Sequence, residues 1–310
     1  MSLRPLIAGL VMTLAATACT AEEDALVVYT SVTQATVDAV VAEFDAAGVQ
    51  VEVFRAPTGE VNARIAAERR EGGLRADVLW LTDPLSMQAY DSEGLLRPVE
   101  PDVSTVPEAF RADRFWGTRI LNLVIVAGES APPITTWDDL VDAAAAGGVA
   151  IPDPAFAGSA FAALGFFALD DRYGMEFLRR LRDAGGTQVG TPGDVVTGVA
   201  EGAYAAGITL DFSARTAVEK GSPLRLIWPE PGAIALYSPI AVTGDHPAAV
   251  EFVSHVVGPE AQAAIAATGW QPVDPSIPWT AGGPQVTVAW DRASDRQEEL
   301  LAAYRDVFGG

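Results

Sequence analysis

The sequence has one cysteine, two histidines and few basic residues, and each scarcity excludes a class of protein. One cysteine allows neither an internal disulfide nor a cysteine-rich zinc site. With 20 basic and 41 acidic residues the net charge is −21, which argues against nucleic-acid binding because that function needs a basic face. Hydrophobic residues make up 49% of the 310 positions, enough for sizeable cores in two lobes of ordinary domain size.

The first 24 residues have the pattern of an export signal. Residues 1–18 comprise a short positive start and an apolar stretch, Leu6–Ala18, that is too short to span a bilayer. The segment resembles a bacterial lipoprotein signal, in which Cys19 is lipidated and residues 19–24 form a tether, although Ala16 replaces the usual leucine. The alternative is an ordinary cleaved secretory signal. Both predict an extracytoplasmic protein, anchored to the cell membrane in the first case, and no later segment is long and apolar enough to cross a membrane.

The stretch Ala25–Val41 is predicted to be a strand that runs directly into a helix. Leu26–Val28 is apolar, and apolar residues then recur at the spacing of one buried helical stripe. The exit loop of such a strand opens at the carboxyl edge of an α/β sheet, where these proteins bind ligands. The loop carries the hydroxyls of Thr30, Ser31 and Thr33 just before a helix N-terminus, which favours an anion. The alternative is that Thr33 only caps the helix.

Two further strand–helix units repeat this chemistry. Val49–Phe54 and Asp77–Leu81 are predicted strands, and a threonine follows each at a helix start: Thr58, with Gly59 beside it, and Thr82. The order βαβαβα favours a parallel sheet with right-handed crossovers. Each threonine alone is a routine cap, but three strand ends at one edge predict a shared cup of neutral donors.

The middle of the chain predicts a second lobe. Ile120–Ala127 is a long apolar strand that would carry the chain out of the first lobe, and Ala233–Val242 is the predicted return. Between them, the strand Val149–Pro152 leads to Gly158-Ser159 at a helix start, which offers the same anion chemistry from the other side.

Two crossing strands imply a paired hinge, with the chain visiting the first lobe twice. We expect residues 25–118 plus 240–275 in the N-terminal lobe and residues 119–239 plus 276–310 in the C-terminal lobe. Further helices are expected over residues 193–203, 247–256, 259–267 and 295–308.

Five segments resemble the extracellular solute-binding proteins of bacterial ABC importers, in the branch that contains ferric-ion-binding proteins and their phosphonate- and phosphate-ester-binding relatives. They are Val27–Ser31, Arg75–Trp80, Glu93–Val99, Ile151–Pro154 and Gly269–Val273. The resemblance implies the type II periplasmic-binding-protein fold, with two α/β lobes, each a mixed sheet flanked by helices, and a ligand cleft between them. It implies a monomer without cofactor or catalysis that closes on a small anionic or zwitterionic ligand and delivers it to a membrane permease.

The residues needed for ferric iron are missing. Ferric-binding members use a histidine, a glutamate and a tyrosine pair, and the matching positions here are Thr33, Thr82 and Asp211-Phe212. Fe³⁺ needs anionic oxygen or imidazole ligands, which threonine hydroxyls cannot replace. The two histidines, His246 and His255, lie in the late return segment and are not expected to bind metal.

The phosphonate-binding branch matches better. Arg55-x-x-Thr58-Gly59 and Gly207–Phe212 resemble motifs of proteins that bind 2-aminoethylphosphonate. Asp211 would pair a ligand ammonium or, alternatively, be a solvated strand-end carboxylate or a helix cap, and Arg55 is read as a surface residue. The predicted ligand-binding residues are Thr30, Ser31, Thr33, Thr58, Gly59, Thr82, Gly158, Ser159, Asp211 and Tyr237.

Three alternatives stay open at this point: a ferric-binding protein, an exported enzyme acting on phosphate esters, and a binding module that senses instead of transporting. The enzyme is disfavoured because the segment Ala157–Phe161 lacks the Gly-x-Ser-x-Gly spacing of a nucleophile elbow. A phosphate-cradling Gly-x-x-x-x-Gly-Lys-Ser/Thr motif is also missing.

Overall fold

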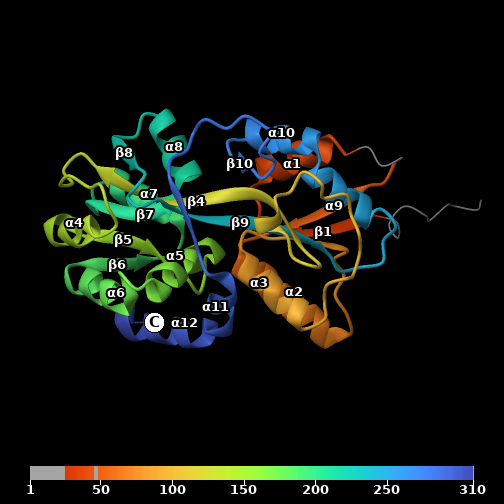
Figure 1. The fold of residues 1–310 in the computed structure, drawn as a ribbon, viewed down its shortest axis with the longest axis horizontal. Coiled ribbons are helices and arrows are strands. Elements are labelled where there is room, and N and C mark those ends of the chain that lie inside the picture. Colours follow the sequence, from red (N-terminus) through yellow and green to blue (C-terminus); the bar gives the residue numbers. More distant parts are fainter. Residues whose placement is uncertain (1–24, 45–47, 310) are drawn as a thin grey trace, which may run out of the picture.

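Two long strands, β4 (Trp116–Gly128) and β9 (Ala233–Val242), run antiparallel through the centre of the computed structural model and join its two lobes (Figure 1). Every residue of both strands is buried. The structure describes residues 25–44 and 48–309, so the predicted signal peptide, the tether and Cys19 lie outside the described residues. The two predicted crossing strands are confirmed.

The N-terminal lobe begins with the predicted parallel arrangement. Strand β1 (Leu26–Thr30) pairs in parallel with β2 (Val51–Arg55) on one side and β3 (Val78–Trp80) on the other, and β3 then pairs antiparallel with the end of β9. The lobe's helices follow these strands or return to it later in the chain. They are α1 (Gln34–Ala42), α2 (Thr58–Glu71), α3 (Pro84–Ser92), α9 (Ala249–Val257) and α10 (Pro259–Ala267).

The C-terminal lobe continues the sheet from the other side of β4. Its strands are β7 (Ala206–Leu210), β5 (Val149–Pro152), β6 (Gly186–Val189) and β8 (Leu224–Ile227). Its helices are α4 (Asp139–Gly147), α5 (Gly158–Leu169), α6 (Gly174–Asp183), α7 (Pro192–Ala200), α8 (Asp211–Glu219), α11 (Trp290–Asp295) and α12 (Gln297–Phe308). Short elements complete the fold: η1 (Glu108–Phe110), β10 (Gln271–Pro272) and β11 (Gln285–Thr287).

The sheet differs from the sequence prediction in its continuity. We expected one mixed sheet in each lobe, but the described strands form a single sheet of order β2-β1-β3-β9-β4-β7-β5-β6, with β8, β10 and β11 attached to its two central strands. The cause is the length of β4, which pairs with β9 over one part and with β7 over another. Helix α8 was anticipated only in the alternative that made Asp211 a helix cap, and Asp211 is instead its first residue, after the N-cap Leu210.

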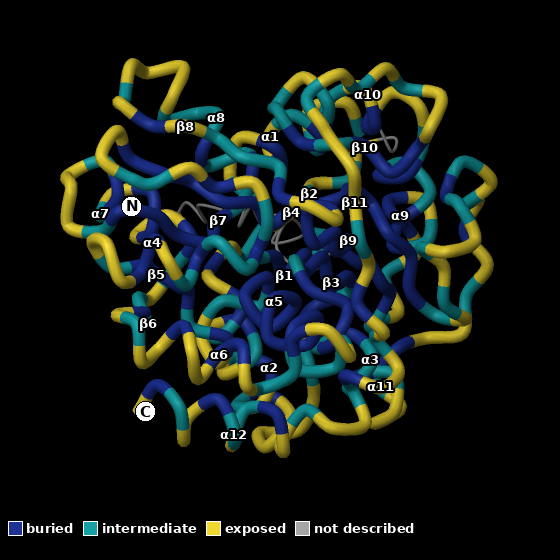
Figure 2. Tube along the Cα trace, turned by 60° about the vertical axis from the view of Figure 1, so that its left-hand side comes forward, coloured by how far each residue is buried: buried dark blue, intermediate teal, exposed yellow. Residues whose placement is uncertain are grey.

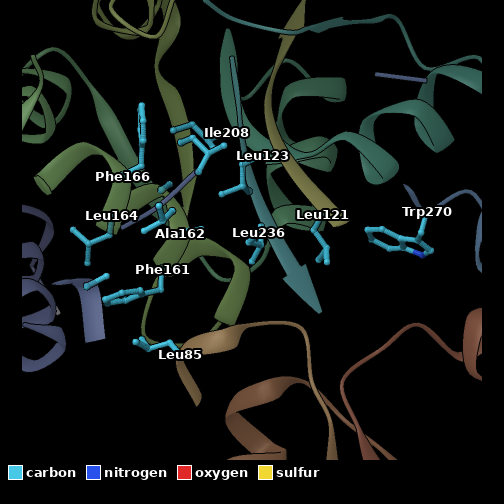
Figure 3. Packing of buried hydrophobic residues seen from close by; sticks show 14 of the residues in the cluster. Leu85, Leu121, Leu123, Phe161, Ala162, Leu164, Phe166, Ile208, Leu236 and Trp270 are labelled. Carbon is cyan, nitrogen blue, oxygen red and sulfur yellow. The ribbon is translucent and has the colours of Figure 1, made fainter. Parts of the chain in front are cut away.

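The core is continuous across the lobes. Figure 2 shows the central strands buried and the outer faces of the helices exposed. Leu121 and Leu123 of β4 belong to the same apolar cluster as Val28 and Trp80 of the N-terminal lobe. Figure 3 shows Leu85 of α3 beneath Phe161 of α5, so apolar side chains of the two lobes face each other. Each fully buried large apolar side chain contributes about 1.5–3 kcal/mol, which makes this shared cluster the main source of stability.

The helices were compared with the length and hydropathy that a membrane-spanning helix requires. Within residues 25–44 and 48–309, no helix combines the length and apolar character needed to cross a membrane.

Glycine 207 tests how tightly the central sheet is packed. A Cβ there would overlap Cγ1 of Val195 and lie 2.7 Å from the carbonyl oxygen of Ala150. We expect Gly207→Ala to lower the unfolding free energy by about 1–3 kcal/mol through overpacking. The matched control is Gly128→Ala, also in a strand, where the nearest atom would be 3.6 Å away. Equal urea unfolding midpoints for the two variants would contradict this packing.

Candidate functional site

A cavity of about 230 Å³ lies between the lobes. It is lined by residues at or just after the ends of strands β1, β2, β3 and β7, by the starts of helices α2, α5, α7 and α8, and by residues of β4. Six of the predicted ligand-binding residues are among the lining residues: Ser31, Thr33, Thr58, Thr82, Gly158 and Ser159.

The three strand ends of the N-terminal lobe meet, as the sequence predicted. The Ser31 hydroxyl donates to Thr82 Oγ1 at 3.2 Å, and Thr58 Oγ1 lies 3.0 Å from the same Thr82 oxygen. Gly158 and Ser159, at the start of α5, contribute the C-terminal lobe's side of the cavity. The structure therefore brings these hydroxyls to one place, and ligand binding by them stays a prediction.

The other four predicted residues do not line this cavity. The Thr30 hydroxyl donates to the Trp80 carbonyl at 2.6 Å and accepts from the Val32 amide at 3.0 Å, so it braces the loop. Gly59 lies one residue beyond Thr58 and faces a smaller neighbouring pocket. Tyr237 packs against Phe110 and faces a different pocket.

Asp211, which was predicted to bind the ligand, is buried in an ion pair outside the cavity lining. It begins α8 with only 2% of its surface exposed, and Arg215, one turn later, approaches it at 3.0 Å. Burial raises the pKa of the Asp211 carboxyl, and the Arg215 guanidinium opposes this shift. Arg215 also donates to the Gly269 carbonyl at 2.6 Å, which links the C-terminal lobe to the segment before β10. The expectation of a solvated strand-end carboxylate is therefore wrong, and the pairing of Asp211 with a ligand ammonium stays a prediction that this ion pair does not favour.

Arg119 is a cavity residue that the sequence analysis did not single out. It lies on β4, lines the cavity and is only 1% exposed. Its Nε and Nη1 atoms are buried with no hydrogen-bond partner, and within the described residues no carboxylate forms an ion pair with it. Burial lowers the pKa of its guanidinium to about 9. A buried, unpaired cation is costly unless something supplies the missing negative charge. The available signal was a single charged residue, Arg119, immediately before the apolar stretch Ile120–Ala127 that was predicted to be a buried strand.

Trp270 holds Arg119 in place and connects the two lobes. The Arg119 guanidinium lies 4.1 Å from the Trp270 ring centroid, and Phe212 of α8 stacks on the indole at 4.2 Å. The indole Nε1 also donates to Thr33 Oγ1 at 3.3 Å. Figure 3 shows Leu121 beside Trp270 at one end of the apolar cluster, and both residues line the cavity.

Several helices begin at the cavity wall without a side-chain cap. The N-cap residues Thr33 of α1, Pro57 of α2, Ala157 of α5 and Leu210 of α8 all line the cavity, and none makes a side-chain capping hydrogen bond. Thr33 thus occupies the expected N-cap position of α1, but its side chain makes no capping hydrogen bond. Its hydroxyl instead bonds to Thr36 Oγ1 at 2.8 Å. First-turn amides and helix dipoles together favour negative charge in this space.

The cavity has no acidic, histidine or tyrosine residue in its lining. Arg55 is exposed at the end of β2, as expected for a strand-end surface arginine, and it also lines the cavity, with its Nε donating to the Val32 carbonyl at 2.9 Å. His255 contacts the Val40 carbonyl through Nε2 at 2.9 Å, away from the cavity. In the part of the chain that the structure describes, no group of three or more His, Cys, Asp or Glu could hold a metal ion.

The family of bacterial extracellular solute-binding proteins has a sequence model that matches residues 25–271. The chain belongs to this family. Its members are extracytoplasmic proteins that bind small ligands for ABC importers, so this broad assignment of the resemblance is confirmed. Comparison with curated protein sequences gives no match.

Solved structures of solute-binding proteins share the fold at low identity. AfuA from Actinobacillus pleuropneumoniae, a periplasmic binding protein solved with exogenous fructose-6-phosphate bound, has a TM-score of 0.79 and 18% identity over 92% of this chain and 99% of its own. The periplasmic binding protein P5PA has a TM-score of 0.80 and 18% identity, over 92% of this chain and 100% of its own. Iron-bound HitA from Pseudomonas aeruginosa has a TM-score of 0.74 and 22% identity, over 92% of this chain and 99% of its own. These likenesses confirm the predicted two-lobed periplasmic-binding-protein fold.

The structural role of Asp211 can be tested through its partner. Arg215→Ala leaves the carboxylate buried without a charge partner, which we expect to cost about 3–5 kcal/mol of unfolding free energy at about pH 7.5. Because burial raises the pKa of Asp211, the folded state binds a proton more readily than the unfolded state. The loss should therefore shrink as the pH falls to about 4.5. Urea unfolding midpoints at the two pH values measure both effects.

The control is the double variant Asp211→Asn with Arg215→Met, which removes both charges and should recover most of the stability. A loss in Arg215→Ala that is independent of pH, without recovery in the double variant, would assign Asp211 another role.

Proposed function

We propose that this protein captures a small oxyanion-bearing solute, a phosphonate or phosphate ester, by closing its lobes, and delivers it to an ABC permease without chemical change. The observation that carries the proposal is the buried guanidinium of Arg119, which lines the cavity and has no counter-charge in the described residues. A bound anion would supply that charge. Charge-assisted hydrogen bonds of this kind are about twice as strong as neutral ones.

The neutral donors around Arg119 suit a tetrahedral oxyanion. Ser31, Thr58 and Thr82 form a connected hydroxyl group on one lobe, and Ser159 with the uncapped start of α5 faces it from the other. A ligand that contacts both sides gains its full set of contacts only when the lobes are together. Its higher affinity for that state would shift the protein towards closure.

The ferric alternative has less support. Fe³⁺ needs anionic oxygen or imidazole ligands, and the cavity lining contains neither carboxylate, tyrosine nor histidine. Relatives of similar fold point in both directions, since AfuA was solved with fructose-6-phosphate and HitA with iron. The lining of this chain's own cavity favours the organic phosphate.

Binding without catalysis is the better proposal for the same cavity. Its serine and threonine hydroxyls lie beside arginines, with no histidine, aspartate or glutamate in the lining to act as a general base.

We also propose that the protein acts as a monomer and is anchored outside the cytoplasm through a lipidated Cys19. Mass spectrometry of the exported N-terminal peptide tests the anchor.

Replacing Arg119 separates binding from stability. Arg119→Met is expected to weaken the binding of fructose 6-phosphate and ethylphosphonate by at least about 30-fold, because truncating one side of a buried charge pair costs about 2–5 kcal/mol. The same variant should unfold at a higher temperature than the wild type without ligand, since it no longer buries an unpaired cation. Calorimetric titration and thermal unfolding measure the two quantities.

The control is Arg225→Met, which replaces an exposed arginine outside the cavity. Retained affinity in Arg119→Met would overturn the proposal.

Affinity should also depend on pH. The Arg119 guanidinium, with a pKa of about 9, loses its charge as the pH rises through that value. Affinity for fructose 6-phosphate, whose phosphate is fully ionised above about pH 8, should therefore fall to about half by pH 9 and about tenfold for each pH unit above that. The residual affinity of Arg119→Met should show no such fall. A wild-type affinity that stays flat to about pH 11 would remove Arg119 from the binding step.

Lobe closure can be tested at Gly158. A Cβ at this position would overlap the carboxylate of Asp83, which belongs to the opposite lobe. Gly158→Ala should therefore hinder the closed arrangement and weaken fructose 6-phosphate binding about tenfold or more, with little change in the unfolding midpoint. The matched control is Gly59→Ala, where the nearest atom would be the Phe156 carbonyl oxygen at 3.6 Å. Equal affinities in the two variants would show that this contact does not limit closure.

A further inference from the structure

The charged side chains in the cavity lining are all positive. Two arginines, Arg55 and Arg119, border it, and four helices begin there without a side-chain cap. The lining contains no aspartate or glutamate. This local charge contrasts with the net charge of −21 over the whole sequence, so the acidic residues lie elsewhere.

The acidic side chains closest in sequence to the lining residues are already occupied. Asp83 is 2% exposed and accepts hydrogen bonds from the Ser86 amide and hydroxyl as the cap of α3. Asp194 accepts from the Thr191 amide and hydroxyl at 2.8 and 2.9 Å in the capping box of α7. Asp211 is paired with Arg215. None of the three offers a free carboxylate to a ligand in the cavity.

The rest of the lining is apolar. Pro57, Leu121, Phe156 and Leu210 border the cavity between the hydroxyls and the arginines. An ammonium placed against these residues would lose its hydration without gaining a partner, and it would be repelled by the nearby guanidiniums. An uncharged carbon body has no such cost there.

From this arrangement we propose that the site selects phosphonates and phosphate esters that carry no cationic group, and discriminates against aminophosphonates. This inference rests on the proposed function and narrows it. It departs from the sequence-based expectation of 2-aminoethylphosphonate, which depended on Asp211 as the partner of the ligand's ammonium. The selected ligand places its oxyanion at Arg119 and its neutral body against the apolar residues.

Two ligands of the same shape test the proposal. Propylphosphonate has a methyl group where 2-aminoethylphosphonate has its ammonium, so the pair differs almost only in that charge. Calorimetric titration of the purified mature protein, freed of bound solute by unfolding and refolding, should give at least about tenfold tighter binding of propylphosphonate. Equal or tighter binding of 2-aminoethylphosphonate would overturn this inference and leave the proposed function standing. If neither of these phosphonates binds, and ethylphosphonate and fructose 6-phosphate also fail, the proposed function fails and the inference with it.

A charge added to the cavity should reverse the preference. Ser213 lines the cavity in the first turn of α8, where an acidic residue is compatible with the helix dipole. Ser213→Asp is expected to shift the affinity ratio at least about tenfold towards 2-aminoethylphosphonate. The control is Ser276→Asp, which adds the same charge at an exposed position outside the cavity. The same ratio in both variants would contradict a selection based on local charge.

Discussion

The burial of one arginine between the lobes is the constraint around which the cavity is arranged. Arg119 comes from the strand that both lobes share, so its position is fixed by the sheet and not by a flexible loop. Trp270 covers one face of its guanidinium. The surrounding hydroxyls and helix starts provide dipoles but no negative charge, so the protein without ligand keeps a cation in a poorly solvated place. In the proposed function, an incoming anion would relieve this cost, and the same contact would draw the two sides of the cavity together.

Long-range and local electrostatics act in opposite directions in this protein. A net charge of −21 repels an anion at a distance, while the cavity attracts it at close range. Salt screens the first effect more than the second, because the cavity groups are partly or wholly removed from solvent. Specificity therefore depends on the placement of a few side chains, and the overall charge of the surface contributes nothing to it.

The parts of the site that follow from local sequence order were predictable. Three strand–helix units in succession place Ser31, Thr58 and Thr82 at one sheet edge, and the structure joins their hydroxyls. Arg119 was not predictable in this way, because no hydrogen-bonding or ion-pair partner in the local sequence marks it and it directly precedes the predicted strand Ile120–Ala127. A charged residue next to an apolar strand should therefore be considered for burial before it is assigned to the surface.

Asp211 and Tyr237 show two other limits. The partner of Asp211 stood four residues along the sequence at Arg215, but that spacing is informative only once helix α8 is recognised. Successive side chains of a strand point to opposite faces of the sheet, so the sequence shows which residues share a face with Tyr237 but not which face borders the cleft. The lobe boundaries at residues 118/119, 239/240 and 275/276 also stay a prediction. What the sequence could not reveal was the continuity of the sheet, since pairing between distant strands depends on the whole topology.

That continuity has a consequence for how the molecule holds together. Strands β4 and β9 are buried along their full length and are shared by both halves. Neither half therefore has a complete hydrophobic core of its own. Cutting the chain at a lobe boundary would expose bare strand edges and apolar surface in both fragments. Neither half is therefore expected to fold as a separate domain when it is expressed alone.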